Sequence, residues 1–329
     1  MPTVTLEADR ATAQLALDGP ASDTVADLAE QLVHRPAAAV DDPAWITAAR
    51  DARHDLPRQL RAPLARFRRH SGPQGALLLR GLPVRDQATL PPTPTVPDSV
   101  QREPSVSAAV LLMIAGALGD PAAYRAEKGG ALVQNVVPVP GSEDVQGNSG
   151  SVLLTFHNEN AFHPHRPDFV MLLCLRADHE GRAGLRTACV RAALPLLDPP
   201  VRERLASPEY VTCPPPSFGP QQDSVVHPVL SGDPADPDVR VDFAATTATT
   251  RRAAQAMEEL RSAFETVQRT VPLRPSELAI VDNRVTVHGR TAFRPRYDGS
   301  DRWLQRTFVL CDLRRSRDHR PGDSHVLTR

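Results

Sequence analysis

Lysine is almost absent from this sequence of 329 residues. Of its 38 basic residues all but Lys128 are arginine. A GC-rich coding bias explains both this excess of arginine and the 33 prolines. The excess of arginine therefore does not by itself indicate a function. The basic residues are balanced by 39 acidic ones, which gives a net charge of −1. This balance argues against a surface that binds nucleic acid or an anionic membrane.

Long apolar segments and paired cysteines are lacking as well. The longest apolar run, at 108–118, is too short to span a bilayer, and residues 1–10 lack the pattern of a signal peptide. The four cysteines are scattered without a C-x-x-C pair, which suits a reducing compartment. We therefore expect a cytoplasmic protein with neither a membrane nor a nucleic acid as partner.

Glycine-rich nucleotide motifs are also missing. No G-x-G-x-x-G opens a helix after a strand, and no G-x-x-x-x-G-K-[S/T] occurs. The sequence has no internal repeat of 20–50 residues either. These absences remove support for the nucleotide-binding folds and for repeat architectures.

Short strands between glycine and proline turns dominate the predicted secondary structure. Helices are expected at 22–32, 43–67 (with breaks at Pro57 and Pro63), 107–118 and 251–270, and short helical pieces at 191–197 and 201–205. Strands are expected at 75–80, 131–137, 152–156, 169–175, 186–190, 277–281 and 307–313. Strands of this length and spacing indicate a sandwich or barrel. The predicted fold class is mainly β with flanking helices (α+β).

The chain is expected to form one domain over residues 1–329. Its helical N-terminal part, 1–74, would pack on the barrel, and 315–329 would be a flexible tail. Residues 83–104 are rich in proline and have almost no periodicity, which excludes a helix or a central strand. A loop this long is either a lid near a site or a plain surface loop.

The residues that indicate chemistry begin with His157 and Glu159. In a strand, the side chains of residues two apart point to the same face, so this imidazole and this carboxylate could bind one metal ion. His288 offers a third ligand, and two histidines with one carboxylate are the facial triad of non-haem iron(II) oxygenases. Zinc hydrolases use similar triads, so the ligands alone leave the metal open. Arg302, fourteen residues after His288, could bind a carboxylate bidentately.

Three segments, 157–164, 168–176 and 288–303, resemble the clavaminate synthase-like family of Fe(II)/2-oxoglutarate-dependent oxygenases. The resemblance implies a double-stranded β-helix (jelly-roll, cupin-like) core, with Fe(II), 2-oxoglutarate and O2 as cofactors. It implies that His157, Glu159 and His288 bind iron, and that Arg302 holds the distal carboxylate of 2-oxoglutarate. His163 and His165, close to the motif, are interpreted as structural residues or as residues that support the metal ligands.

The same resemblance implies an amino-acid site. Arg306 would anchor the α-carboxylate of the substrate and Glu127 its α-amino group, and Asn148 lies in a substrate-contacting loop. Relatives also contact 2-oxoglutarate through a threonine at the position of Leu185. Either the strand is shifted and Thr187, two residues later on the same strand face, makes the contact, or the hydrogen bond is missing here.

This sequence also departs from the family pattern at the residues that would contact the side chain of the substrate. Arginine hydroxylases of the family clamp a guanidinium with an Asp-x-Asp pair, whose counterparts here are Arg240 and Asp242. A cation at Arg240 would repel a guanidinium. We therefore expect hydroxylation at Cβ of a free polar amino acid such as asparagine, in specialised-metabolite biosynthesis.

Arginine hydroxylation or desaturation is the alternative within the family. A catalytically silent jelly-roll protein that binds a metal or a small acid is the alternative of another class. The sequence does not indicate an oligomeric state.

Overall fold

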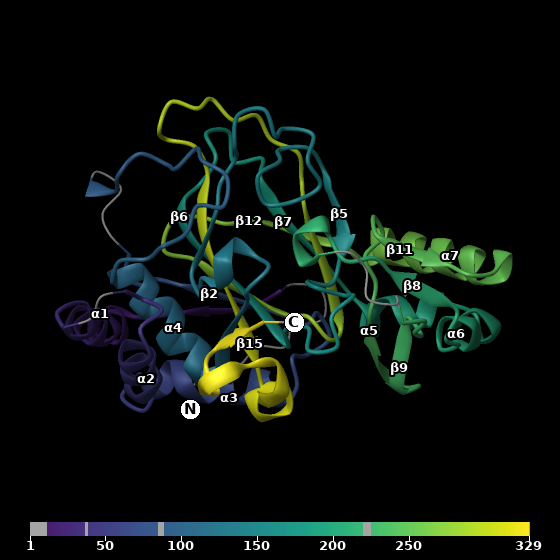
Figure 1. Ribbon diagram of the computed structural model, residues 1–329, viewed down its shortest axis with the longest axis horizontal. Coiled ribbons are helices and arrows are strands. Elements are labelled where there is room, and N and C mark those ends of the chain that lie inside the picture. The colour runs from purple at the N-terminus through teal and green to yellow at the C-terminus, as the bar shows by residue number, and fades with distance from the viewer. Residues whose placement is uncertain (1–11, 37–38, 85–88, 220–224, 329) are drawn as a thin grey trace.

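Two β-sheets form the centre of the molecule in the computed structural model, which describes residues 12–36, 39–84, 89–219 and 225–328 (Figure 1). The larger sheet has the order β1-β2-β13-β6-β15-β3-β16, and β4 also pairs with β15. Its strands are β1 (Ala13–Ala16), β2 (Ala76–Arg80), β3 (Asp120–Tyr124), β4 (Gln134–Val136), β6 (Phe169–Arg176), β13 (Leu278–Asp282), β15 (Trp303–Leu310) and β16 (Val326–Leu327). The smaller sheet has the order β12-β7-β14-β5 and is made of β5 (Leu154–His157), β7 (Gly184–Cys189), β12 (Arg269–Pro272) and β14 (Thr286–Arg290).

Apolar side chains fill the space between the two sheets. Val170 and Leu172 of β6 belong to one buried cluster with Leu185 of β7. The alternate residues of β6, Met171 and Leu173, belong to the cluster that packs against the N-terminal helices. Successive side chains of a strand point to opposite faces, so both faces of β6 are covered. This explains its unbroken apolar sequence.

Four helices cover the other face of the larger sheet (Figure 1). They are α1 (Gly19–Val33), α2 (Pro43–Ala52), α3 (Arg58–Arg69) and α4 (Val106–Leu118). Asp18 caps α1 by accepting a hydrogen bond from the backbone N–H of Ala21 at 2.9 Å. The apolar run at 108–118 lies in α4, where nearly every side chain is buried. The run is therefore a core helix, and no described helix is long and apolar enough to cross a membrane.

The expected break at Pro57 is confirmed, but the one at Pro63 is wrong. The chain leaves the helical conformation between α2 and α3, and Pro57 precedes the first residue of α3. Pro63 lies inside α3, where it removes one backbone donor. The helix continues because Leu60, Leu64 and Phe67 bury an apolar face on its neighbours.

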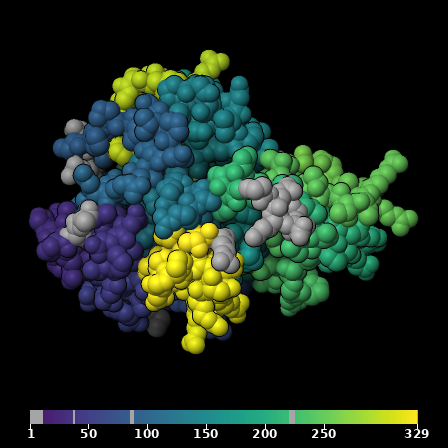
Figure 2. Space-filling view, in the orientation of Figure 1, coloured from purple at the N-terminus to yellow at the C-terminus, as the bar shows by residue number. Residues whose placement is uncertain are grey.

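A second group of helices packs against the smaller sheet and projects from one side of the molecule (Figures 1 and 2). It contains α5 (Val190–Ala193), α6 (Pro199–Leu205) and α7 (Arg251–Val267). Two short ladders join them: β8 (Tyr210–Thr212) with β11 (Thr246–Ala248), and β9 (Leu230–Asp233) with β10 (Asp236–Val239). Leu260 and Phe264 of α7 share a buried cluster with Phe156 and Val287. This packing fixes the outer side of the two strands that carry His157 and His288.

The end of the chain differs from the expected flexible tail. A 3-10 helix (Leu313–His319) is followed by β16, which pairs in parallel with β3. Arg320 is buried and donates hydrogen bonds to the carbonyl groups of Leu313 and Ser324. Leu327 is buried as well. The described part of this segment packs along the edge of β3, and its few apolar residues do not indicate such a pairing in the sequence.

The described part of the proline-rich segment, 83–84 and 89–104, is tied to the loop before Arg302. The backbone N–H of Thr93 donates to the carbonyl of Gly299 at 2.8 Å, and its hydroxyl donates to the carbonyl of Asp301 at 2.7 Å. Arg176 donates to the Thr93 hydroxyl at 2.6 Å. A role as a lid stays a prediction.

Strand boundaries differ from the expected ones in two places that matter for the site. His288 lies in the middle of β14, a strand that is absent from the expected set. The closing strand begins at Trp303, so that Arg306 lies within β15. Both residues are thus held by strand hydrogen bonds.

Candidate metal centre and cavities

Strand pairing brings the three expected metal ligands together. β14 pairs with β5 so that His288 lies opposite His157, and their ring centroids are 4.4 Å apart. Glu159 follows β5 by two residues, and its Oε2 lies 3.5 Å from Nε2 of His288. One ligand atom from each of the three side chains lies within 4.8 Å of the others. The geometry therefore fits a single metal ion held by His157, Glu159 and His288.

The protonation states of these groups also suit a divalent cation. Nδ1 of His157 lies 2.9 Å from the carbonyl of Thr155, a bond that places the proton on Nδ1 and leaves Nε2 for a metal. Burial opposes ionisation of Glu159, but Arg306 and the two imidazoles outweigh it and hold its pKa well below the usual range. Burial and the neighbouring His157 lower the pKa of His288. Two imidazoles and one carboxylate form the ligand set of a non-haem iron(II) site.

Two asparagines that sequence reasoning missed hold the triad in place. The side chain of Asn158 donates to the carbonyls of Asn283 and Thr286 at 2.9 and 3.1 Å. Asn283 accepts from the backbone N–H of Glu159 at 2.8 Å and donates to its carbonyl at 3.0 Å. The sequence signal was weak, since an asparagine beside a ligand or in a turn is common. Together they lock the segment after β5 to the turn before β14.

A narrow inner cavity runs from the triad to Arg302 between the two sheets. Its walls include apolar side chains of β6 and β7, and Arg290 and Arg302 line it together with His288. Arg302 is buried and has no hydrogen bond or ion pair with any residue in the described ranges. Burial lowers its pKa to about 10. A buried cation that forms no ion pair is costly, so this end of the cavity suits a carboxylate.

Arg290 has a different environment from Arg302, although both lie near the ring of Phe293. Its guanidinium donates to the carbonyls of Gly147 at 3.4 Å and Val152 at 3.2 Å. Burial and the charge of Arg302 lower its pKa to about 9. Arg290 therefore fixes the loop that contains Asn148.

The structure distinguishes Leu185 from Thr187. In the pairing of β7 with β14, Leu185 lies opposite Arg290 and Thr187 lies opposite His288. Leu185 is among the residues that line the inner cavity, whereas Thr187 is buried without lining it. The contact between Thr187 and 2-oxoglutarate thus stays a prediction.

Arg306 is the centre of a buried polar network. Its guanidinium donates to the carboxylate of Glu127 and the amide oxygen of Gln134, and to Oε1 of Glu159 at 3.1 Å. The amide oxygen of Asn148, when turned towards it, accepts from its two Nη atoms at 3.2 and 3.0 Å. Burial would lower the pKa of Arg306, but the two carboxylates outweigh it and raise the pKa. Glu127, Asn148 and Arg306 thus lie together, and Gln134 is an added member, while their roles in substrate binding stay a prediction.

A central cavity of about 350 Å³ lies in front of the triad. His157, Glu159, Asn148, Arg306 and Asp242 all line it. Oδ1 of Asp242 accepts a hydrogen bond from the backbone N–H of Ala244 at 2.8 Å, and the backbone of Asp242 bridges that of His157. A carboxylate therefore lies at the wall of this cavity, close to a metal ligand.

Arg240 is held away from this cavity. Its guanidinium donates to the carbonyls of Ala161 and Phe162, the latter at 2.8 Å, and Arg240 lines none of the three cavities described here. The expectation that its charge faces the substrate side chain thus has no geometric support. Residue spacing along a strand does not reveal that a long side chain turns back to nearby carbonyls.

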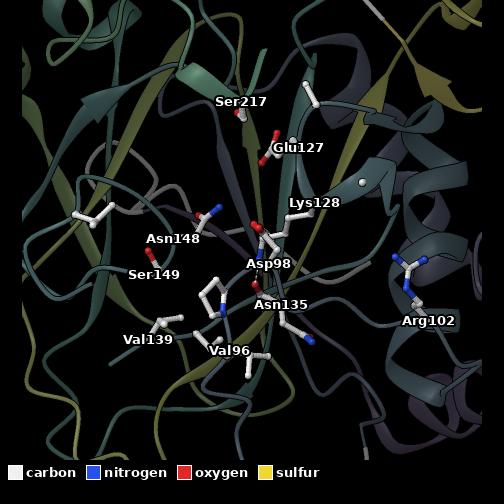
Figure 3. A pocket seen from close by; sticks show the side chains of 15 residues that line it. Val96, Asp98, Arg102, Glu127, Lys128, Asn135, Val139, Asn148, Ser149 and Ser217 are labelled. Carbon is white, nitrogen blue, oxygen red and sulfur yellow. Dashed lines mark hydrogen bonds between the residues drawn. The ribbon is translucent and has the colours of Figure 1, made fainter. Parts of the chain in front are cut away.

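An outer cavity of about 650 Å³ adjoins the central one (Figure 3). Glu127, Lys128, Asp98 and Asn148 line it, and Asn148 borders all three cavities. The ammonium group of Lys128 donates to the carbonyls of Asn135 and, at 3.2 Å, of Ser99. Burial and the charge of Arg306 lower the pKa of Lys128 to about 8. The single lysine thus joins the proline-rich segment to the strand beside Arg306.

The smaller sheet carries a His-carboxylate-His triad, and arginines line the adjoining cavities. This arrangement is that of the facial-triad class of mononuclear metalloproteins. The family model of the taurine catabolism dioxygenase TauD, TfdA family matches residues 43–308, and the chain belongs to that family.

Curated relatives cover nearly the whole chain. An L-asparagine oxygenase of Streptomyces coelicolor is 62% identical over 314 residues, which are 94% of this chain and 93% of the relative. Clavaminate synthase 2 of Streptomyces clavuligerus is 36% identical over 299 residues, 89% of this chain and 91% of the relative. The resemblance to the clavaminate synthase-like oxygenases is thus confirmed.

Solved structures agree with these relatives. An asparagine oxygenase in complex with Fe(II), 2S,3S-3-hydroxyasparagine and succinate superposes with a TM-score of 0.93 at 61% identity, covering 96% of this chain and 99% of that one. The oxygenase OrfP in complex with Fe and alpha-ketoglutaric acid gives a TM-score of 0.87 at 28% identity, covering 96% and 100%.

Proposed function

We propose that this protein is an Fe(II)- and 2-oxoglutarate-dependent oxygenase that hydroxylates free L-asparagine at Cβ. The observation that carries the proposal is the placement of Asp242 and Arg306 in one cavity beside the metal triad. This arrangement can hold both ends of a small amino acid with a polar side chain. The relative that is 62% identical is an L-asparagine oxygenase, which favours asparagine over arginine as the substrate.

The core of the fold is proposed to be a double-stranded β-helix. The strand order β4-β15-β6-β13 in one sheet and β5-β14-β7-β12 in the other supports this topology. In both sheets, strands that are distant in sequence alternate, as expected when an antiparallel ribbon winds into two sheets. The metal ligands would then lie on neighbouring strands at one end of the core.

The inner cavity is proposed to hold 2-oxoglutarate. Arg302 would bind its distal carboxylate, while the keto-acid end would reach a metal held by His157, Glu159 and His288. Iron, 2-oxoglutarate and O2 supply the oxidant that converts a C–H bond to a C–OH bond. The apolar walls of the inner cavity exclude water, so the charge on Arg302 acts in a low-dielectric environment.

The central cavity is proposed to orient asparagine. Arg306 would bind the α-carboxylate, and Glu127, which contacts Arg306 and lines the adjoining outer cavity, would bind the α-ammonium group. Oδ2 of Asp242 would accept from the side-chain amide, because Oδ1 already accepts from the backbone of Ala244. Three fixed contacts determine which C–H bond faces the metal. Asn148, at the border of all three cavities, would complete the carboxylate site.

Asparagine turnover provides the direct test. With Fe(II), 2-oxoglutarate and O2, we expect asparagine-dependent release of succinate and one 3-hydroxyasparagine per succinate. A panel of the twenty amino acids and their relatives, with both products quantified, checks this. Faster coupled turnover of arginine or another amino acid would contradict the assignment of asparagine. In the absence of O2, a weak visible charge-transfer band with Fe(II) and 2-oxoglutarate reports the cofactor complex independently.

Replacement of Arg302 tests the cofactor site separately. Arg302→Gln should raise the KM for 2-oxoglutarate by roughly 100-fold, since a buried charge-assisted pair is lost. The KM for asparagine should change by less than about threefold. Steady-state kinetics with each substrate varied in turn measures both constants, and a larger effect on asparagine would reverse the assigned roles of Arg302 and Arg306.

A further inference from the structure

A second group of possible metal ligands lies outside the site described above. His165, Asp318 and His319 each offer one ligand atom, and these atoms lie within 4.8 Å of one another. The ring centroids of His165 and His319 are 4.8 Å apart, with the planes at 75°. The corresponding separation of His157 and His288 is 4.4 Å. The three residues, here called the His165 cluster, thus have nearly the spacing of the iron ligands.

The backbone holds both histidines of the cluster in place. The backbone N–H of His165 donates to Nδ1 of His163 at 3.0 Å, and its carbonyl accepts from the hydroxyl of Tyr124 at 2.6 Å. The carbonyl of His319 accepts from the backbone and hydroxyl of Thr328 at 2.8 and 3.0 Å. Ligands fixed in this way lose little freedom when they bind a metal.

The surroundings of His165 favour the neutral imidazole that a metal ion requires. Burial and the neighbouring His319 and Arg284 lower the pKa of His165, while Asp318 opposes this shift. Neither of its ring nitrogens has a hydrogen bond within the part of the chain that the structure describes. Oδ2 of Asp318 lies 3.6 Å from Nε2 of His319 and supplies a negative charge. Asp318 is largely exposed, which leaves room for water as a fourth ligand.

A third group of similar composition lacks these properties. His179, Asp298 and Asp301 are also close together, but the group has one imidazole only. Both carboxylate oxygens of Asp301 already accept backbone hydrogen bonds, from Arg296 at 2.7 Å and Tyr297 at 2.5 Å. This carboxylate holds the turn before Arg302, so its oxygens are less suited to bind a metal ion than those of Asp318.

We propose that His165, Asp318 and His319 form a second divalent-cation site that takes Zn²⁺. Two imidazoles and a carboxylate, with an open position for water, form a donor set that zinc commonly accepts. The bound ion would connect the segment that follows the iron ligands to the C-terminal segment. That segment pairs through β16 with β3, and β3 leads to Glu127. The ion thus stabilises the strand edge next to the substrate cavity, and the inference does not rest on the proposed substrate.

Counting bound zinc in matched variants tests the site. The full chain should bind two equivalents of Zn²⁺ by isothermal titration, the double variant H157A/H288A one, and the double variant H165A/H319A one. Excess Zn²⁺ should raise the melting temperature of H157A/H288A by several degrees, because a ligand that binds only the folded state stabilises it. The variant that lacks all four histidines should show neither binding nor a shift.

A replacement of the exposed His54 serves as a matched control, since it removes a surface histidine outside both sites. His54→Ala should leave two equivalents bound. The single variant His319→Gln keeps a polar side chain and should lose the second equivalent even if H165A/H319A fails to fold. If H157A/H288A binds no zinc, or if H165A/H319A still binds two equivalents, the second site does not exist.

Discussion

Arg306→Gln should raise the KM for asparagine by 100-fold or more and lower the free energy of unfolding by about 3–5 kcal/mol. The kinetic effect follows from loss of Arg306, the only arginine among the described residues that line the central cavity. The stability effect follows from the buried carboxylates of Glu127 and Glu159, both of which Arg306 contacts. Denaturant titration and steady-state kinetics on the same preparation measure the two effects.

Two comparisons make the result for Arg306 specific. Arg306→Lys keeps a positive charge but lacks the planar guanidinium that reaches several acceptors at once. The free energy of unfolding should therefore fall less than in Arg306→Gln, while the KM for asparagine should stay as high as in that variant. Arg302→Gln should show the opposite kinetic pattern, with 2-oxoglutarate affected and asparagine spared. An unchanged KM for asparagine in folded Arg306→Gln would rule out the proposed carboxylate anchor.

Asp242→Asn should change the preferred substrate from asparagine towards aspartate. The wild-type carboxylate repels a second carboxylate and accepts from an amide. In the variant, Oδ1 of the new amide can still accept from the backbone of Ala244, where Oδ1 of Asp242 does now. Its Nδ2 would then face the cavity and donate to a carboxylate. We expect kcat/KM for asparagine to fall by roughly 100-fold and the ratio of aspartate to asparagine turnover to rise by more than that.

Asp242→Ala is the control for this switch. It removes both the charge and the cap on Ala244, so asparagine turnover should fall without a matching gain for aspartate. Product analysis of competition assays with both amino acids measures the preference directly. A gain for aspartate in Asp242→Ala equal to that in Asp242→Asn would show that charge removal alone decides specificity.

The metal ligands could be predicted from sequence because their chemistry is local. His157 and Glu159 are two residues apart, and His288 lies in a segment that resembles relatives over sixteen residues. The register that places His288 opposite His157 needs the pairing of β14 with β5. No periodicity in either segment specifies that pairing.

The direction of long side chains could not be predicted. Arg240 follows β10, Arg290 lies in β14 and Arg306 lies in β15. Arg240 holds backbone carbonyls, Arg290 holds a loop, and Arg306 binds two carboxylates. An arginine side chain reaches acceptors several ångströms from its Cα, so its neighbours in space decide its role. The order of the C-terminal segment was missed for a related reason, because its partners in β3 lie about two hundred residues earlier.

The contact between Arg306 and Glu159 has a thermodynamic consequence. One oxygen of Glu159 accepts from Arg306, and the other faces the imidazole of His288. An anion that binds Arg306 therefore competes with Glu159 for the same positive charge and alters the electron density that this carboxylate offers to a metal. Any such coupling of binding free energies is reciprocal. Occupancy by the amino acid and occupancy by the metal must then change each other's dissociation constants by the same factor.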